Sequence, residues 1–565
     1  MCKLCDEGKP QDHGSSQIGR RDFLKTAAAT GVAAGSLNLF AARPAAAHDS
    51  DPPDDHGRHD RRYVIRNGYV MTMEPGTPGQ DSPFGEFIEG DVLVEGKKIK
   101  AIGKNLHVGN AAEIDARGKV VMPGFIDTHH HQAWTPIRSS IPDSILINDF
   151  TGTASAEQNY AINVLGFGAA PARPGFAEHY TPEDVYIGEL FGGLSQLDAG
   201  VTTVHDISQI HHSKEHSLAA IQALRDTGRR AKFGFFESAG GIDGGSWYPS
   251  GANFLRNNVL SSDDSLVTMV MGGEVYLGNA TTRQSWTIGR NLGLQVAAHI
   301  LSPFGIRPIL DQLAGVSPDV VDGSGADLSG IEIGADNLFV HMTGMSDAAW
   351  EKVALAGAKV SIAFPIEMNM RHGMPPILKM QQLKAKFGID FEPSLSVDVE
   401  TNMTADFFTQ MRSAMTMQRM VVNQKILELG TFSPPFTSQW PLPPYPADIP
   451  PLLNARDVLR FATINGAKHL RLDGKTGSLK VGKEADIIIL DGNHLNVFPM
   501  NNVPGAVVTL MERTNVETVI VAGTVRKWKG QLLDVDLRHL RRQLEKSRDS
   551  LYTAVGRPQN RFPFL

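Results

Sequence analysis

Pro123-Gly124-Phe125-Ile126-Asp127-Thr128-His129-His130-His131 is the stretch from which the architecture of this chain is best read. Its apolar first half predicts a buried strand, and its polar second half predicts that the C-terminal end of this strand lies at a functional site. Alternate residues of a strand share one face, so His129 and His131 point the same way. A lone buried histidine is usually a core residue, but an alternate pair at the C-terminal end of a strand indicates a metal site.

Seven more apolar runs follow this strand, and helical patterns separate them. The predicted strands are residues 201–204, 232–236, 266–271, 294–298, 338–340, 360–363 and 394–397. One helix is well marked, with Thr181 as its N-cap, Pro182 in its first turn and Gly200 at its stop. Eight strands that alternate with helices predict an α/β fold, a (β/α)₈ TIM-like barrel over residues 123–472.

Two β-rich segments flank the barrel, at residues 63–122 and 473–534. Neither is large enough for a comfortable core alone, so we expect both chain ends to form one small β-sandwich. Residues 535–565 are expected to form a helical arm that packs on the body or contacts a second copy in a homo-oligomer. Two long loops, at 143–180 and 431–452, are predicted lids or binding loops.

The composition narrows the chemistry. The chain has 565 residues, and its two cysteines are Cys2 and Cys5. A disulfide scaffold or a thiolate site in the body is therefore excluded. The net charge of -7 without a dense basic stripe argues against a nucleic-acid partner. Nineteen histidines remain as candidate metal ligands.

The N-terminal sequence has the pattern of an export signal. Paired Arg20 and Arg21 precede an Ala/Gly-rich apolar stretch that ends at Ala45-Ala46-Ala47. This pattern predicts a twin-arginine signal over residues 1–47 and a polar linker over 48–62. We therefore expect twin-arginine export machinery as a partner and a periplasmic or secreted protein. A membrane-spanning helix is the weaker alternative, because the stretch is too short and too polar.

Other predicted strands also end in candidate ligands. His299 follows residues 294–298, His341 follows 338–340, and Asp398 follows 394–397. The C-terminal face of such a barrel carries the active site, so these side chains should converge with His129 and His131. Imidazoles and a carboxylate suit Zn²⁺, with Fe²⁺ as the alternative, and leave a position open for water.

The first motif closely resembles the strand-one motif of the amidohydrolase superfamily. Thr463-Ile464-Asn465-Gly466-Ala467 and residues 477–486 resemble its C-terminal signature. The order of these motifs along the chain resembles that in the branch of the superfamily with cytosine deaminase, guanine deaminase and the triazine chlorohydrolases. The resemblance implies one metal on His129, His131, His299 and Asp398, and it implies that Asp398 moves the proton. It also implies that His341 binds the metal or positions the attacking water.

One position departs from the ring deaminases of this branch. They carry a glutamate three residues after the strand-five histidine, where this chain has Ser302. Serine does not shuttle protons near neutral pH unaided. The departure favours cleavage of a C–N bond in an amide, urea, carbamate or cyclic amide over ring deamination. Glu367 is the best candidate for a replacement catalytic carboxyl.

The substrate pocket is less well specified. Trp134 and Ser302 are candidate substrate contacts, and nearby methionines suggest a small, aromatic molecule. Glu237 follows the third strand, and Glu274, after the fourth, is expected to have a surface or capping role. Two alternatives stay open. One is an aminohydrolase or chlorohydrolase that acts on a heterocycle, and the other is a periplasmic binding protein that has lost turnover.

Overall fold

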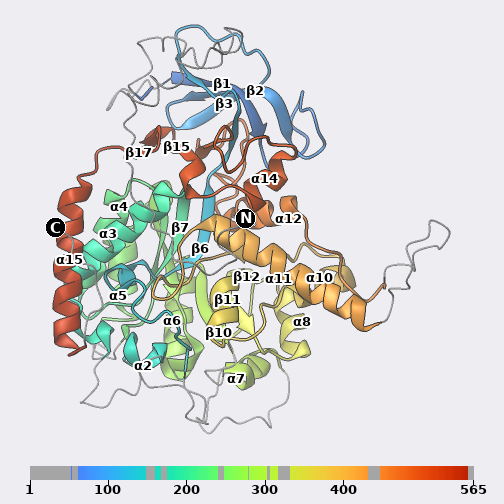
Figure 1. Ribbon diagram of the computed structural model, residues 1–565. Coiled ribbons are helices and arrows are strands. Elements are labelled where there is room, and N and C mark those ends of the chain that lie inside the picture. The colour runs from blue at the N-terminus through green and yellow to red at the C-terminus, as the bar shows by residue number, and fades with distance from the viewer. Residues whose placement is uncertain are drawn as a thin grey trace, which may run out of the picture. The chain divides into compact units, whose positions relative to one another are not determined.

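The computed structural model describes residues 52–53, 62–147, 159–166, 175–239, 247–277, 279–301, 306–315, 331–429 and 446–557 (Figure 1). The expected signal over 1–47, most of the 48–62 linker, most of the 431–452 loop, and Ser302 lie outside these residues. Those interpretations stay predictions. No helix in the described part of the chain has the length and apolar character needed to cross a membrane.

The eight predicted barrel strands are all present and lie side by side in chain order. Each neighbouring pair is parallel. All residues of the first two strands are buried, as expected for parallel strands covered by helices. The strands are β6 (Phe125–His130), β7 (Val201–Ser208), β8 (Arg230–Phe235), β9 (Val267–Gly272), β10 (Val296–Leu301), β11 (Asn337–Thr343), β12 (Lys359–Ile362) and β13 (Ser394–Leu395).

The barrel closes where its first and last strands meet. The backbone N–H of His131 donates to the carbonyl of Asp398, and the N–H of Asp398 donates to the carbonyl of His129, each at 2.9 Å. Lower down, the Thr128 hydroxyl donates to the carbonyl of Leu395 at 3.0 Å. The predicted (β/α)₈ barrel is thus confirmed, and its closure fixes strand one against Asp398.

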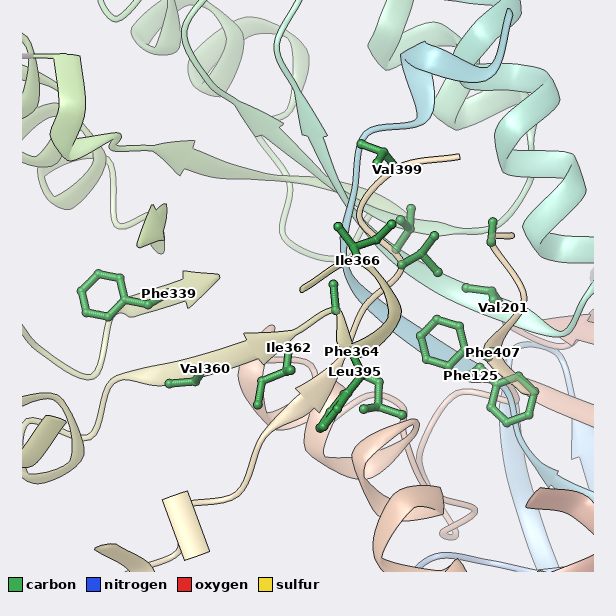
Figure 2. Packing of buried hydrophobic residues seen from close by; sticks show 14 of the residues in the cluster. Phe125, Val201, Phe339, Val360, Ile362, Phe364, Ile366, Leu395, Val399 and Phe407 are labelled. Carbon is green, nitrogen blue, oxygen red and sulfur yellow. The ribbon is translucent and has the colours of Figure 1, made fainter. Parts of the chain in front are cut away.

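Helices cover the outside of this barrel. In α3 (Pro182–Asp198), Thr181 caps the N-terminus as predicted, and its hydroxyl accepts from the N–H of Asp184. Figure 2 shows the apolar layer beneath the helices, where the rings of Phe125 and Phe407 stack 5.7 Å apart. The other main helices are α4 (Lys214–Asp226), α6 (Asn279–Asn291), α7 (Ile306–Leu313), α8 (Asp347–Leu355), α10 (Ile377–Phe387), α11 (Phe407–Glu428), α12 (Ala455–Phe461) and α13 (Ile464–His469).

The two flanking β-rich segments form one sheet, which fits the predicted sandwich from both chain ends. The junction is an antiparallel pairing of β14 with β5, and β5 also pairs with β1. Apolar side chains of both segments share a core, including Tyr63, Val92 and Ile487. The strands are β1 (Arg62–Met71), β2 (Glu86–Glu95), β3 (Lys98–Gly103), β4 (Ala112–Asp115), β5 (Lys119–Pro123), β14 (Ile487–Asp491), β15 (Val516–Val521), β16 (Thr524–Trp528) and β17 (Gln531–Leu532).

The described part of the C-terminal arm contains one helix. Its helix α15 (Leu537–Ala554) runs alongside α3 within the same chain (Figure 1). This contact agrees with a packing role, and a homo-oligomer stays a prediction.

Candidate metal centre

Three imidazoles from two barrel strands converge on one point. His129 and His131 come from β6 and the residue after it, and His299 comes from β10. Their Nε2 atoms lie 3.0 Å (His129–His131), 3.2 Å (His129–His299) and 3.3 Å (His131–His299) apart. A tetrahedral Zn²⁺ with bonds of about 2.0–2.1 Å needs ligand atoms roughly 3.3–3.4 Å apart. The triangle of nitrogens therefore has the size that a small divalent metal requires.

The protonation of these rings supports the same interpretation. His131 Nδ1 faces the carbonyl of Ile207 at 3.1 Å, and His299 Nδ1 faces the carboxylate of Glu274. Both partners only accept, so both Nδ1 atoms carry protons and Nε2 is the atom of each ring that is left to bind a metal. When both Nε2 atoms are unprotonated, their buried lone pairs at 3.3 Å repel each other unless a cation lies between them. The residues present thus fit a divalent metal.

Asp398 and His341 complete the cluster. Asp398 Oδ1 lies 3.6 Å from Nε2 of both His129 and His131, and its Oδ2 lies 3.6 Å from Nε2 of His341. His129, His341 and Asp398 form a second group of ligand atoms within 4.8 Å of one another. Both His341 and Asp398 have left-handed backbones, with φ of 72° and 69°. Such strain is typical of functional sites and here aims both side chains into the barrel mouth.

Burial sets the charge of the cluster. Burial, followed by neighbouring imidazoles, lowers the pKa values of His129, His131 and His341 well below the ordinary value, so these rings are neutral, as metal ligands must be. Burial raises the pKa of Asp398 to about 7. A carboxyl with this pKa is suited to take up and return a proton near neutrality.

Two buried carboxyl groups accept hydrogen bonds from the Nδ1 atoms of His299 and His341. Glu274 is fully buried, and its second oxygen also accepts the backbone N–H of His299 at 2.9 Å. The expected surface or capping role of Glu274 is therefore wrong, because this side chain orients a candidate ligand. Glu367 accepts from His341 Nδ1 at 2.9 Å and from the N–H of Ala363 at 3.1 Å. Such outer contacts fix ring tautomer and orientation.

A small cavity of about 30 Å³ lies against the cluster, with room for about one or two water molecules. Glu367 is not among its lining residues, so the structure places this candidate catalytic carboxyl behind His341. Trp134 is also not in the lining, since its ring packs edge-on against Tyr180 in the core. The cavity is lined by His131, Leu146, Tyr160, Leu165, Gln209, Tyr276, His299, Leu301, His341, Met370, His372, Asp398 and Val399.

The sequence interpretation missed two polar residues around this cavity. Gln209 and Tyr276 are in its lining, and both donate to Glu237, which it had placed only as a residue after the third strand. Each follows a barrel strand closely along the chain. The rule that singled out His299 and Asp398, polar residues at C-terminal strand ends, would have found them if applied to all eight strands.

Comparison with known proteins agrees with this geometry. The sequence profile described as the amidohydrolase family matches residues 448–526. A 5′-deoxyadenosine deaminase of Methanosarcina barkeri is 26% identical over 502 residues, covering 87% of this chain and 99% of the relative. A 5-methylthioadenosine/S-adenosylhomocysteine deaminase of Desulforudis audaxviator is 25% identical over 508 residues, covering 87% of this chain and 100% of the relative.

Solved structures share the fold. An adenosine deaminase from Xanthomonas campestris with bound zinc superposes with a TM-score of 0.66 at 20% identity, covering 87% of this chain and 98% of its own. An atrazine chlorohydrolase from Arthrobacter aurescens, complexed with zinc, gives 0.64 at 18% identity, with 86% and 100% covered. With the motifs and the closed barrel, these likenesses make the chain similar in sequence and fold to the amidohydrolase superfamily, in the branch of the deaminases and triazine chlorohydrolases.

Proposed function

We propose that this protein is a metal-dependent hydrolase that cleaves a carbon–nitrogen bond in a small molecule. One observation carries the proposal: three imidazole nitrogens face one another within 3.3 Å, beside the carboxyl group of Asp398. His129, His131, His299 and Asp398 would hold one divalent metal, with Zn²⁺ expected over Fe²⁺. A metal bound there lowers the pKa of a coordinated water from 15.7 to about 7.

The chain's own groups supply the proton transfers and the orientation. Asp398, with a pKa near 7, takes the proton of the attacking water and returns it to the leaving nitrogen. His341 is held through Nδ1 by Glu367, so its Nε2 faces Asp398 Oδ2. In this position His341 orients the water or polarises the bond under attack. Glu367 is thus proposed as a positioning residue and not as the second acid.

The first substrate class that we propose is a heterocycle with an amino group, from which the enzyme releases ammonia. The names of the relatives support this choice, because 98 curated proteins match and those quoted above are deaminases. Ser302 favours the second candidate, hydrolysis of an amide, urea or cyclic amide, since that reaction needs no ring protonation. The two candidates differ in the nitrogen compound that they release.

A substrate panel on the purified full chain separates them. Metal content is measured first, and ammonia and amine release are then followed with amino-purines, amino-triazines, N-aryl ureas and cyclic imides. We expect about one zinc per chain and ammonia release from an amino-heterocycle. Asp398→Asn should lose turnover, whereas the control Asp91→Asn, at a buried sandwich carboxylate paired with Arg66, should keep it. Full activity after chelation, or in Asp398→Asn, would contradict the mechanism.

We also propose export by the twin-arginine route, on the evidence of Arg20-Arg21 and the small residues at 45–47. This route carries folded proteins, which suits a barrel loaded with metal. A reporter fusion with both arginines changed to lysine should stay in the cytoplasm, whereas the parent sequence should carry the reporter out. Equal export of the two would refute the proposal.

A further inference from the structure

One wall of the cavity is built around a single carboxylate that does not itself line the cavity. Glu237 lies after β8, and its Oε1 accepts from the Gln209 amide at 2.9 Å and from the Tyr276 hydroxyl. Glu237 and Gln209 are both buried. Gln209 and Tyr276 line the cavity together with His131, His299 and Asp398. Two lining residues from different strand ends thus point their donors away from the cavity, toward one oxygen.

This arrangement determines which polar groups the wall can offer. A phenol has one proton, and that of Tyr276 is committed to Glu237, so its Oη presents only lone pairs to other partners. Burial and the two nearby carboxylates raise the pKa of Tyr276 well above its ordinary value, so the proton stays on the phenol. When Glu237 is ionised it cannot donate, so the amide nitrogen of Gln209 faces it and uses one of its two N–H groups there, and the amide oxygen remains an acceptor.

We propose that Glu237 is a positioning residue that makes this wall hydrogen-bond-accepting, and that the wall selects substrates whose reacting end carries an N–H donor. The inference rests on the proposed function and narrows its substrate class to amino-substituted rings over oxygen-substituted analogues. Because the cavity holds only about 30 Å³, a group that contacts this wall also lies beside the metal cluster. The donor that is recognised is therefore on, or next to, the bond that is cleaved.

Two purine ribosides test the proposal, because they differ in one group. Adenosine presents an amino donor at carbon 6, and 6-methoxypurine riboside presents only an acceptor there. Their kcat/KM ratio is measured with the zinc-loaded full chain for the wild type, Tyr276→Phe, Glu237→Leu and the control Tyr248→Phe. The control removes a buried hydroxyl that donates to the carbonyl of Gly272 and does not line the cavity.

The two test variants should change the ratio in different ways. Tyr276→Phe removes one acceptor, so kcat/KM for adenosine should fall about 10-fold while the methoxy probe changes little. Glu237→Leu removes the oxygen that accepts from both Gln209 and Tyr276, so the Tyr276 proton can turn to the cavity. The kcat/KM for adenosine should then fall about 10-fold, and the kcat/KM for the methoxy probe should rise. A role in folding alone would lower both probes equally, and Tyr248→Phe should leave the ratio unchanged.

Failure of the inference differs from failure of the proposed function. If the wild type hydrolyses either probe but both test variants keep the wild-type ratio, the accepting wall is refuted and the hydrolase stands. If the wild type hydrolyses neither, the proposed function fails for this substrate class. The same pair is then titrated calorimetrically, and the ratio of Kd values replaces that of kcat/KM. No binding of adenosine, or a ratio that Tyr276→Phe leaves unchanged, overturns the inference.

Discussion

Changing Glu274 to glutamine should weaken zinc binding although residue 274 is not a ligand. The two carboxylate oxygens of Glu274 accept from two donors of one residue, the backbone N–H and the Nδ1–H of His299. A glutamine offers one oxygen and one NH₂ group. If its oxygen keeps the backbone N–H, its NH₂ faces Nδ1, which must then accept. The ring proton moves to Nε2 and occupies the position where the metal binds.

The magnitude follows from the contacts. The reverse glutamine orientation sets the NH₂ group against a backbone N–H that lies 2.9 Å from the present oxygen, so each orientation loses a charge-assisted hydrogen bond. Such a bond contributes about 1.5–3 kcal/mol, which corresponds to roughly 10–150-fold in an equilibrium constant. Removal of a partner behind a metal-bound histidine typically costs about 10–100-fold in affinity. We therefore expect zinc to bind about 10–100-fold more weakly.

Competition with a chromophoric chelator measures this change. Metal-free wild type and Glu274→Gln are titrated with zinc at one pH, and thermal melting shows whether the variant is folded. Glu86→Gln is the matched control, because that buried glutamate pairs with Arg456 and belongs to the sandwich strand β2. The control should bind zinc like the wild type. An unchanged zinc affinity in a folded Glu274→Gln would refute the tautomer argument.

The remaining predictions concern the metal, two buried carboxyls and an ion pair. Chelation should abolish turnover and lower the Tm, since a ligand at 1,000 times its Kd stabilises by about 4 kcal/mol; an unchanged Tm would count against a resident metal. Glu367→Leu should lower kcat at least about tenfold with zinc content unchanged, whereas Glu367→Gln, which keeps an accepting oxygen, should stay near wild type in steady-state kinetics. Burial raises the pKa of Glu237 to about 7, and nearby Glu274 adds to the shift. Acidification from pH 8 to 6 neutralises Glu237 and weakens the hydrogen bonds that it accepts from its two donors. The kcat/KM ratio of adenosine to the methoxy riboside should therefore decrease as the pH is lowered, and a ratio that does not change with pH would contradict this. Arg230→Met leaves the buried carboxylate of Asp486 without its cation, while Glu484 keeps Lys97, and it should cost about 3–5 kcal/mol in urea unfolding.

The fold could be predicted because each barrel element carries a local pattern. Buried parallel strands read as apolar runs, and Thr181 marks a helix start through its own side chain. His129 and His131 could be paired because the period of a strand is two. Their convergence with Asp398 needed one further step, the closure of the barrel. Closure joins residues about 270 positions apart through hydrogen bonds that no local pattern encodes.

The roles of the residues that support the candidate ligands could not be predicted from such local patterns. Glu274 and Glu367 differ from surface carboxylates only in what they contact, since Glu274 meets His299 and Glu367 meets His341. Trp134 shows the opposite error, because a large aromatic residue after the first strand suggested a pocket but lies in the core. Strand alternation sets the face of a residue within a strand. It does not set the direction of a residue that follows the strand's end.

Backbone conformation resolves that ambiguity at two positions of the centre. His341 lies in β11 and Asp398 lies just past β13, and both have left-handed backbones that break the regular alternation. A non-glycine residue in this region costs about 1–3 kcal/mol, so the surrounding structure must hold it there. For Asp398 the restraint is visible, because its N–H and its carbonyl are bonded to β6 and the residue that follows it, the segment that carries two candidate ligands. The same two hydrogen bonds therefore close the barrel and set the carboxylate beside His129 and His131. Disruption of barrel closure at this seam should consequently release zinc and lower stability together.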